Sequence, residues 1–146
     1  MRRFSRFSYL NKPPQQARPN PSLGVVRTLE QILAEVDKAD VFSGVKVDSV
    51  RSESLSGETA LHIYAKWGDA EAIRILVANG VDIDKRGEDD NTALHYAAML
   101  GHLSATQCLV ELGAANTRDM YGNLPIDLAG EHADIKAFLT SSGYDA

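Results

Sequence analysis

The chain has 146 residues, of which 44% are hydrophobic and 24% charged, the composition of an ordinary soluble domain with its own core. Its longest apolar runs fall well short of the roughly 18 residues that a membrane-spanning helix needs. A single cysteine, Cys108, excludes an internal disulfide framework and favours a reducing compartment. We therefore expect a cytoplasmic protein.

The net charge of −5 conceals two parts of opposite sign. Residues 1–29 hold six of the 15 basic side chains and no acid, so the remainder carries nine basic against all 20 acidic residues. Such an acidic body repels nucleic acid phosphates and attracts basic protein surfaces. We expect a protein partner with a basic rim, and no nucleic acid or membrane bound by the acidic part.

The first segment, residues 1–26, contains four of the five prolines and shows no helical period. This composition predicts an extended or disordered basic arm. Arginine and serine interrupt its aromatic residues, so it lacks the apolar stretch of a secretory signal. An organelle transit peptide stays open as an alternative, but an interaction arm or a docked tail fits the segment better.

A different pattern begins after the arm. Thr28 is a candidate N-cap, and the residues that follow it are apolar at helical spacing: Leu29, Ile32, Leu33 and Val36. This pattern predicts a helix. Residues 27–56 are then interpreted as a degenerate repeat that caps the N-terminal end of the domain.

The rest of the chain repeats itself. Thr59-Ala60-Leu61-His62 recurs 33 positions later as Thr92-Ala93-Leu94-His95, and residues 122–127 form a weaker third copy. Within each strong copy a threonine can cap a first helix, and glycines end the first and second helices. A period of this length predicts a stack of helix–turn–helix–loop units, none of which buries its apolar face alone.

The repeated segment resembles the ankyrin repeat, whose signature is T-P-L-H-x-A with a period of 33 residues. The resemblance implies an all-α ankyrin-repeat solenoid over residues 57–146. Its three repeats would be 57–89, 90–121 and 122–146, the last a shortened and more polar C-terminal cap. Ala60 and Ala93 replace the family's proline, which should loosen the entry turn of each repeat without redirecting it.

No pattern of catalysis or metal binding is found in the sequence. Equivalent histidines of adjacent repeats, His62 and His95, should lie about 10 Å apart, too far to share a zinc ion that needs ligands at about 2.1 Å. We expect each to hydrogen-bond loop backbone and tie one repeat to the next. Cys108 has no evident base and should be an inert, buried thiol. We predict no enzyme, no cofactor and no metal.

The resemblance also implies a binding surface, because ankyrin-like proteins grip partners with loop tips and with the exposed side of the first helices. Carried over to this sequence, those positions are Lys66, Trp67, Arg86, Glu88, Asp89, Met99, Leu100, Met120, Tyr121 and His132. The large apolar members are costly to leave in water unless a partner, a neighbouring residue or the arm covers them.

The sequence therefore predicts a non-enzymatic adaptor or inhibitor, monomeric by default, that binds a protein through its concave face and loop tips. Two alternatives stay open. One is an immunity-type inhibitor of a basic toxin or nuclease, and the other is a subunit of a larger assembly docked through the basic arm.

Overall fold

The computed structural model describes residues 26–39, 42 and 44–146. Within these residues the chain forms seven α-helices, one 3-10 helix and no strand. The elements are α2 (Leu29–Lys38), α3 (Ala60–Trp67), α4 (Ala70–Ala78), η3 (Glu88–Asp90), α5 (Ala93–Met99), α6 (Leu103–Glu111), α7 (Pro125–Leu128) and α8 (Ala133–Ser141).

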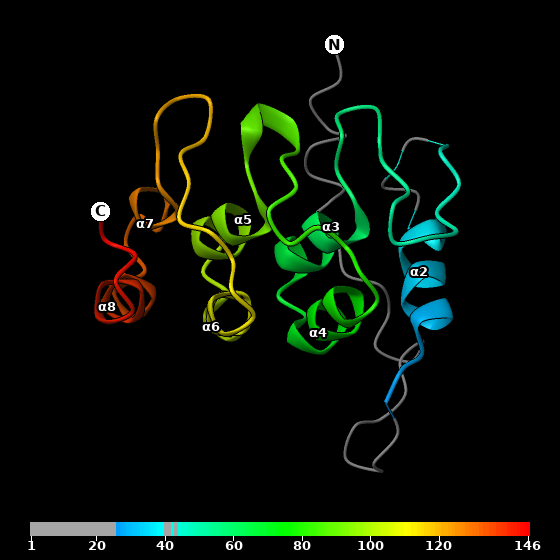
Figure 1. Ribbon diagram of the computed structural model, residues 1–146, viewed down its shortest axis with the longest axis horizontal. Helices are drawn as coiled ribbons and strands as arrows, with labels where there is room; N and C mark the ends of the chain where they lie inside the picture. The colour runs from blue at the N-terminus through cyan, green and yellow to red at the C-terminus, as the bar shows by residue number, and fades with distance from the viewer. Residues whose placement is uncertain (1–25, 40–41, 43) are drawn as a thin grey trace.

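The helices stack in two rows (Figure 1). The first helices of the repeats, α3, α5 and α7, lie side by side in one row, and the second helices, α4, α6 and α8, form the other. Helix α2 closes the N-terminal end, where it packs against both α3 and α4. The loops between repeats project from the first-helix row. The expected all-α ankyrin-type solenoid is confirmed.

Local signals in the sequence set the helix ends. Thr28 caps α2 in a reciprocal box with Gln31, as the sequence predicted. The backbone N–H of Thr59 donates to His62 Nδ1 at 3.0 Å, and the backbone N–H of Thr92 donates to His95 Nδ1 at 3.1 Å. At its other end α3 stops at Gly68, whose φ of 75° is the left-handed conformation that glycine adopts without strain.

Small and large residues share the core between the rows. Ala65, Ala97 and Ala98 are fully buried, which lets adjacent first helices approach closely. Tyr64 and Trp67 fill the N-terminal part of the core, with ring centroids 5.2 Å apart in an edge-to-face arrangement. Cys108 is buried in the same core, as expected. Burial raises the pKa of its thiol, which keeps it protonated and unreactive.

The C-terminal repeat ends the stack with a polar face. Helix α7 has only four residues, and α8 exposes Lys136, Thr140 and Ser141. Its buried residues, Ile135 and Leu139, pack toward α6 and α7. This distribution is what a terminal repeat needs, because one of its faces meets water instead of another repeat.

Candidate functional site

Each strong repeat contains one histidine that hydrogen-bonds the loop following its helices. His62 Nε2 lies 2.8 Å from the carbonyl oxygen of Lys85, and His95 Nε2 lies 3.0 Å from that of Asn123. Since each Nδ1 accepts a threonine N–H, the proton sits on Nε2 and is donated to the carbonyl. Both histidines hydrogen-bond loop backbone, as expected. His95 thereby joins one repeat to the next, whereas Lys85 belongs to the same repeat as His62.

Burial lowers the pKa of His62 and of His95 below the usual histidine value, because a buried imidazolium loses its hydration. The neutral tautomer is also the form that both hydrogen bonds require. These imidazoles therefore hold the loops against the first helices, His95 across a repeat boundary, and are unavailable for proton transfer with a ligand.

The loops between repeats share one geometry and stand side by side. Each closes with a backbone hydrogen bond at equivalent positions: Ser54 N to Glu58 O at 2.8 Å, Gly87 N to Asn91 O at 2.9 Å, and Asp119 N to Asn123 O at 2.9 Å. These three hairpin-like loops repeat with the period of the sequence. The projecting loops of Figure 1 are therefore a regular row.

Further contacts join neighbouring loops. Lys85 forms an ion pair with Glu53 at 2.9 Å. Arg86 Nη1 donates to the carbonyl of Arg118 at 2.8 Å and to that of Asp90 at 3.1 Å. The backbone N–H of Met120 donates to Asp89 O at 3.0 Å. These bonds fix the loops relative to one another, so the surface that the loops form is pre-organised.

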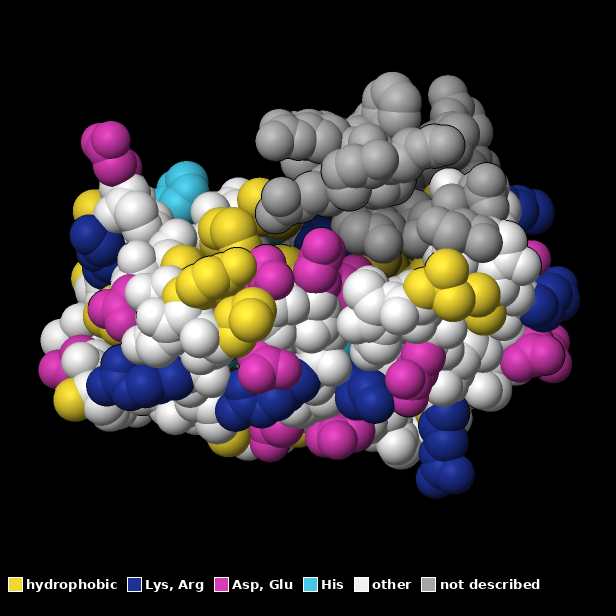
Figure 2. Space-filling view, turned by 90° about the horizontal axis from the view of Figure 1, so that it is seen from above, with side chains coloured by type: hydrophobic (Ala, Val, Ile, Leu, Met, Phe, Trp, Pro, Cys, Tyr) yellow, Lys and Arg dark blue, Asp and Glu magenta, His cyan; other side chains and the backbone are white. Residues whose placement is uncertain are grey.

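Large apolar side chains are exposed at the tips of these loops. Leu55 is 88% exposed, Met120 59% and Tyr121 69%. Asp89 and Asp90 lie in the loop between them, and both have left-handed backbone conformations with φ of 58° and 61°. Figure 2 shows this face from above, with hydrophobic side chains in separate groups and acidic side chains beside them. We call Leu55, Asp89, Asp90, Met120 and Tyr121 the loop-tip surface.

The first-helix ends differ from expectation in the first strong repeat. Lys66 and Trp67, predicted to face outward, are both buried, and Trp67 is 0% exposed. Trp67 turns into the core against Tyr64. Lys66 forms an ion pair with Glu58 at 2.8 Å, and its ammonium lies 4.2 Å above the ring of Tyr96. The prediction that these two residues are exposed anchors is wrong.

Glu58 is the centre of that buried cluster. Its side chain is fully buried, and Tyr96 donates its hydroxyl to Oε2 at 2.5 Å. Burial alone would raise the pKa of Glu58, but the Lys66 ammonium and the hydrogen bonds outweigh it and hold the pKa low. Glu58 and Lys66 come from one repeat and Tyr96 from the next, so the cluster fastens two repeats together.

Of the remaining predicted site residues, some are half-buried and others are exposed to solvent. Met99 is half-buried and packs against the core, and Leu100 is half-buried at the end of α5. Glu88 and Asp89 are half-buried, whereas Arg86, Met120, Tyr121 and His132 are exposed. Arg86 is exposed but engaged with loop carbonyls. The accessible part of the predicted site therefore lies at the loop tips more than along the first helices.

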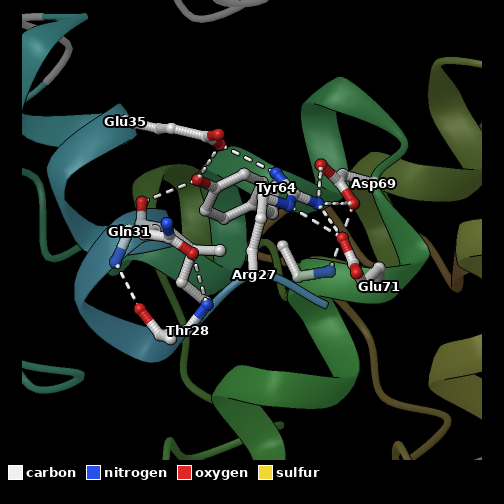
Figure 3. Close-up of polar contacts among 9 residues, drawn as sticks. Arg27, Thr28, Gln31, Glu35, Tyr64, Asp69 and Glu71 are labelled. Atoms are coloured by element: carbon white, nitrogen blue, oxygen red, sulfur yellow. Dashed lines mark hydrogen bonds and ion pairs between the residues drawn. The ribbon is translucent and has the colours of Figure 1, made fainter. Parts of the chain in front are cut away.

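An ion cluster where α2 meets α4 is not evident from the sequence (Figure 3). Arg27 is buried, and its guanidinium contacts Glu35 at 2.8 Å, Asp69 at 2.7 Å and Glu71 at 2.6 Å. Tyr64 donates its hydroxyl to Glu35 at 2.7 Å. Burial alone would lower the pKa of Arg27, but these carboxylates, Asp69 foremost, raise it overall. The sequence does not single out Arg27, because its partners lie 8 to 44 positions away.

The described residues include no group of three or more His, Cys, Asp or Glu side chains placed to hold a metal ion. None of the helices in the described part of the chain is long and apolar enough to cross a membrane. The surface feature that the geometry offers is thus the loop-tip surface.

The stacked helical hairpins and the regular loop row define a helical-repeat solenoid, a class whose extended surfaces bind other molecules. Residues 26–120, more than half of the chain, match the family model described as ankyrin repeats (three copies). This chain belongs to the ankyrin repeat family, whose repeats are in general protein–protein interaction modules.

Curated relatives share the repeats in very different contexts. The chain is 37% identical over 95 residues to alpha-latroinsectotoxin-Lt1a of Latrodectus tredecimguttatus, covering 64% of this chain and 7% of the toxin. It is 36% identical over 115 residues to SH3 and multiple ankyrin repeat domains protein 1 of Homo sapiens, covering 77% of this chain and 5% of that protein. It is 37% identical over 62 residues to the mitochondrial liver isoform of glutaminase of Rattus norvegicus, covering 41% and 10%. The chain therefore matches a tenth or less of the length of these relatives.

Proposed function

We propose that this chain is a non-enzymatic interaction module, an adaptor or inhibitor, that binds a partner protein through the loop-tip surface and the adjoining concave face. The exposed apolar side chains of Leu55, Met120 and Tyr121 are the observation that carries this proposal. Large apolar side chains aligned on a rigid face are typical of binding sites, and tyrosine is among the most frequent interface anchors.

The partner should combine apolar and basic groups. Residues 53–58, 85–91 and 118–123, which form the three loops, carry six acidic and three basic side chains. Glu58 and Asp119 are buried, which leaves four acidic side chains near the surface, three of them (Glu88, Asp89 and Asp90) in one loop. Lys85 is paired with Glu53, and Arg86 and Arg118 donate to loop carbonyls. The loops thus retain an acidic balance around their apolar tips. A partner with an apolar centre and a basic rim is complementary to this pattern.

Several further assignments belong to the same proposal. Residues 1–26 serve as a basic arm, 27–56 as the N-terminal cap and 57–146 as the three repeats. The protein acts as a monomer in the cytoplasm, which suits a free, buried Cys108. It acts by stoichiometric binding, without a cofactor, since the buried histidines hydrogen-bond loop backbone and the Glu58 cluster joins two repeats.

Affinity capture with a loop-tip variant tests the proposal. The variant Met120→Ser/Tyr121→Ser removes two exposed anchors, each worth more than about 1 kcal/mol in a typical interface, so binding should fall by about 30-fold or more. A matched control, Lys136→Ser/Thr140→Ser, changes two exposed residues of α8. Retention of the same partner by wild type and by the loop-tip variant alike would refute the assigned surface.

A further inference from the structure

We propose that residues 1–25 of this chain, which lie outside the described residues, are an intramolecular ligand of the loop-tip surface and compete with the partner. This inference deepens the proposed function and rests on the surface assigned there. The arm would occupy the loop tips until a partner displaces it.

The chemistry of the arm matches the partner expected from the surface. Residues 1–25 contain five basic side chains and no acid. Within residues 2–10, basic and aromatic residues are interleaved: Arg2, Arg3, Phe4, Arg6, Phe7 and Tyr9. The loop-tip surface presents exposed apolar side chains with Asp89 and Asp90 between them. Arm and surface are therefore complementary in charge and in apolar character.

The Arg27 cluster fixes the point from which the arm starts. Three carboxylates hold the guanidinium within 2.8 Å at the junction of α2 and α4. Twenty-five residues can extend over at most about 80–90 Å. The packed series α2, α3, α5 and α7 spans about 30 Å, at about 8–10 Å between neighbouring helices. Every loop tip is thus within reach of the arm.

Tethering gives even a weak contact a large effect. A segment joined to the repeats by a short flexible linker has an effective concentration of about 1 mM. If the arm binds its surface with a Kd of about 0.1 mM, it occupies the surface about nine-tenths of the time. An external ligand of the same surface then binds about tenfold more weakly than it would without the arm.

The test uses full-length chains and a fluorescent synthetic peptide of residues 1–25, with binding followed by anisotropy. Arg2→Gln/Arg3→Gln/Arg6→Gln, called the arm-neutralised chain, removes three of the five positive side chains of the tethered arm and should bind the peptide about tenfold more tightly than wild type does. Adding Asp89→Asn/Asp90→Asn should abolish that gain, because asparagine tolerates the left-handed backbone but carries no charge. The matched control Asp145→Asn, at an exposed site beyond α8, should retain it.

Each other outcome overturns the inference. Equal peptide affinity in wild type and arm-neutralised chains, or binding to neither, means that the arm does not occupy this surface. A peptide gain that survives Asp89→Asn/Asp90→Asn places the arm elsewhere, provided that circular dichroism shows the variant folded. Concentration-dependent dimers of wild type in ultracentrifugation would assign the arm to a second copy. None of these results decides whether a partner protein binds the loop-tip surface. Photo-crosslinking from position 121 tests that separately.

Discussion

Arg27→Met removes the cation at the centre of the cluster between α2 and α4, and we expect it to destabilise the N-terminal end of the stack. The guanidinium is buried and contacts three carboxylates, two of which, Glu35 and Asp69, are themselves buried. Breaking a buried ion pair by removing one partner costs about 3–5 kcal/mol, because charge remains in a poorly hydrated site. For a chain of this size we expect the melting temperature to fall by about 6–20 °C.

The assay is thermal and urea unfolding of full-length chains, followed by circular dichroism and by the fluorescence of Trp67, the only tryptophan. Arg74→Met is a matched control. It makes the same substitution at an exposed pair, Arg74 with Glu111 at 3.0 Å, where we expect a loss of no more than about 1 kcal/mol. Adding Glu35→Gln to Arg27→Met should recover part of the stability by deleting one buried negative charge.

Equal, small losses for Arg27→Met and Arg74→Met would refute this reasoning. They would mean that water or a rearranged side chain satisfies the carboxylates left by Arg27→Met, so that no uncompensated buried charge remains. Hydrogen exchange of the α2 backbone amides measures how much the substitution destabilises the N-terminal cap alone. A cost of 3–5 kcal/mol confined to the cap corresponds to at least a hundredfold loss of amide protection there, with α8 unchanged.

Other predictions concern the contacts between repeats. Gly68→Ala should lower stability by more than about 1 kcal/mol in urea unfolding, because φ is 75° and the new Cβ would lie 2.5 Å from an imidazole atom of the next repeat; a neutral effect would contradict the geometry. Tyr96→Phe removes the hydroxyl donated to Glu58 and should cost about 1.5–3 kcal/mol; a gain in stability would show that this bond does not hold the repeats. The depressed pKa values of His62 and His95 mean that the unfolded chain binds more protons. Their stabilisation is therefore present above about pH 6.5 and is lost as the pH falls below it, by at most about 1.4 kcal/mol per pH unit for each histidine. Replacing both with glutamine should flatten that part of the stability curve, and an unchanged slope would assign it to other groups.

The sequence predicts the fold well where the signal is local or periodic. The Thr28 cap of α2 depends on residues only three positions apart, and it forms as predicted. The roles of His62 and His95 follow from their repetition in register, because a residue at an equivalent position in each unit faces an equivalent loop. The composition of the last repeat likewise predicts the polar outer side of α8.

The site was predicted less well, because a repeat register aligns equivalent positions but does not show what each side chain meets. Trp67 and Leu100 occupy equivalent positions of the register, yet Trp67 is buried in the core while Leu100 is half-buried. Lys66 is drawn inward by Glu58, eight positions before it, and by Tyr96 from the next repeat. Such non-periodic pairings, like that of Arg27, appear only once the chain is folded.

The most direct measurement of the central claim is site-specific photo-crosslinking in cells. A benzoylphenylalanine in place of Tyr121 puts a reactive group at the loop tips, and the same residue in place of Thr140 puts one on the exposed side of α8. The loop-tip assignment predicts a discrete, light-dependent adduct with one partner protein from position 121 and none from position 140. An adduct from position 140 alone, or equal adducts from both, would contradict it.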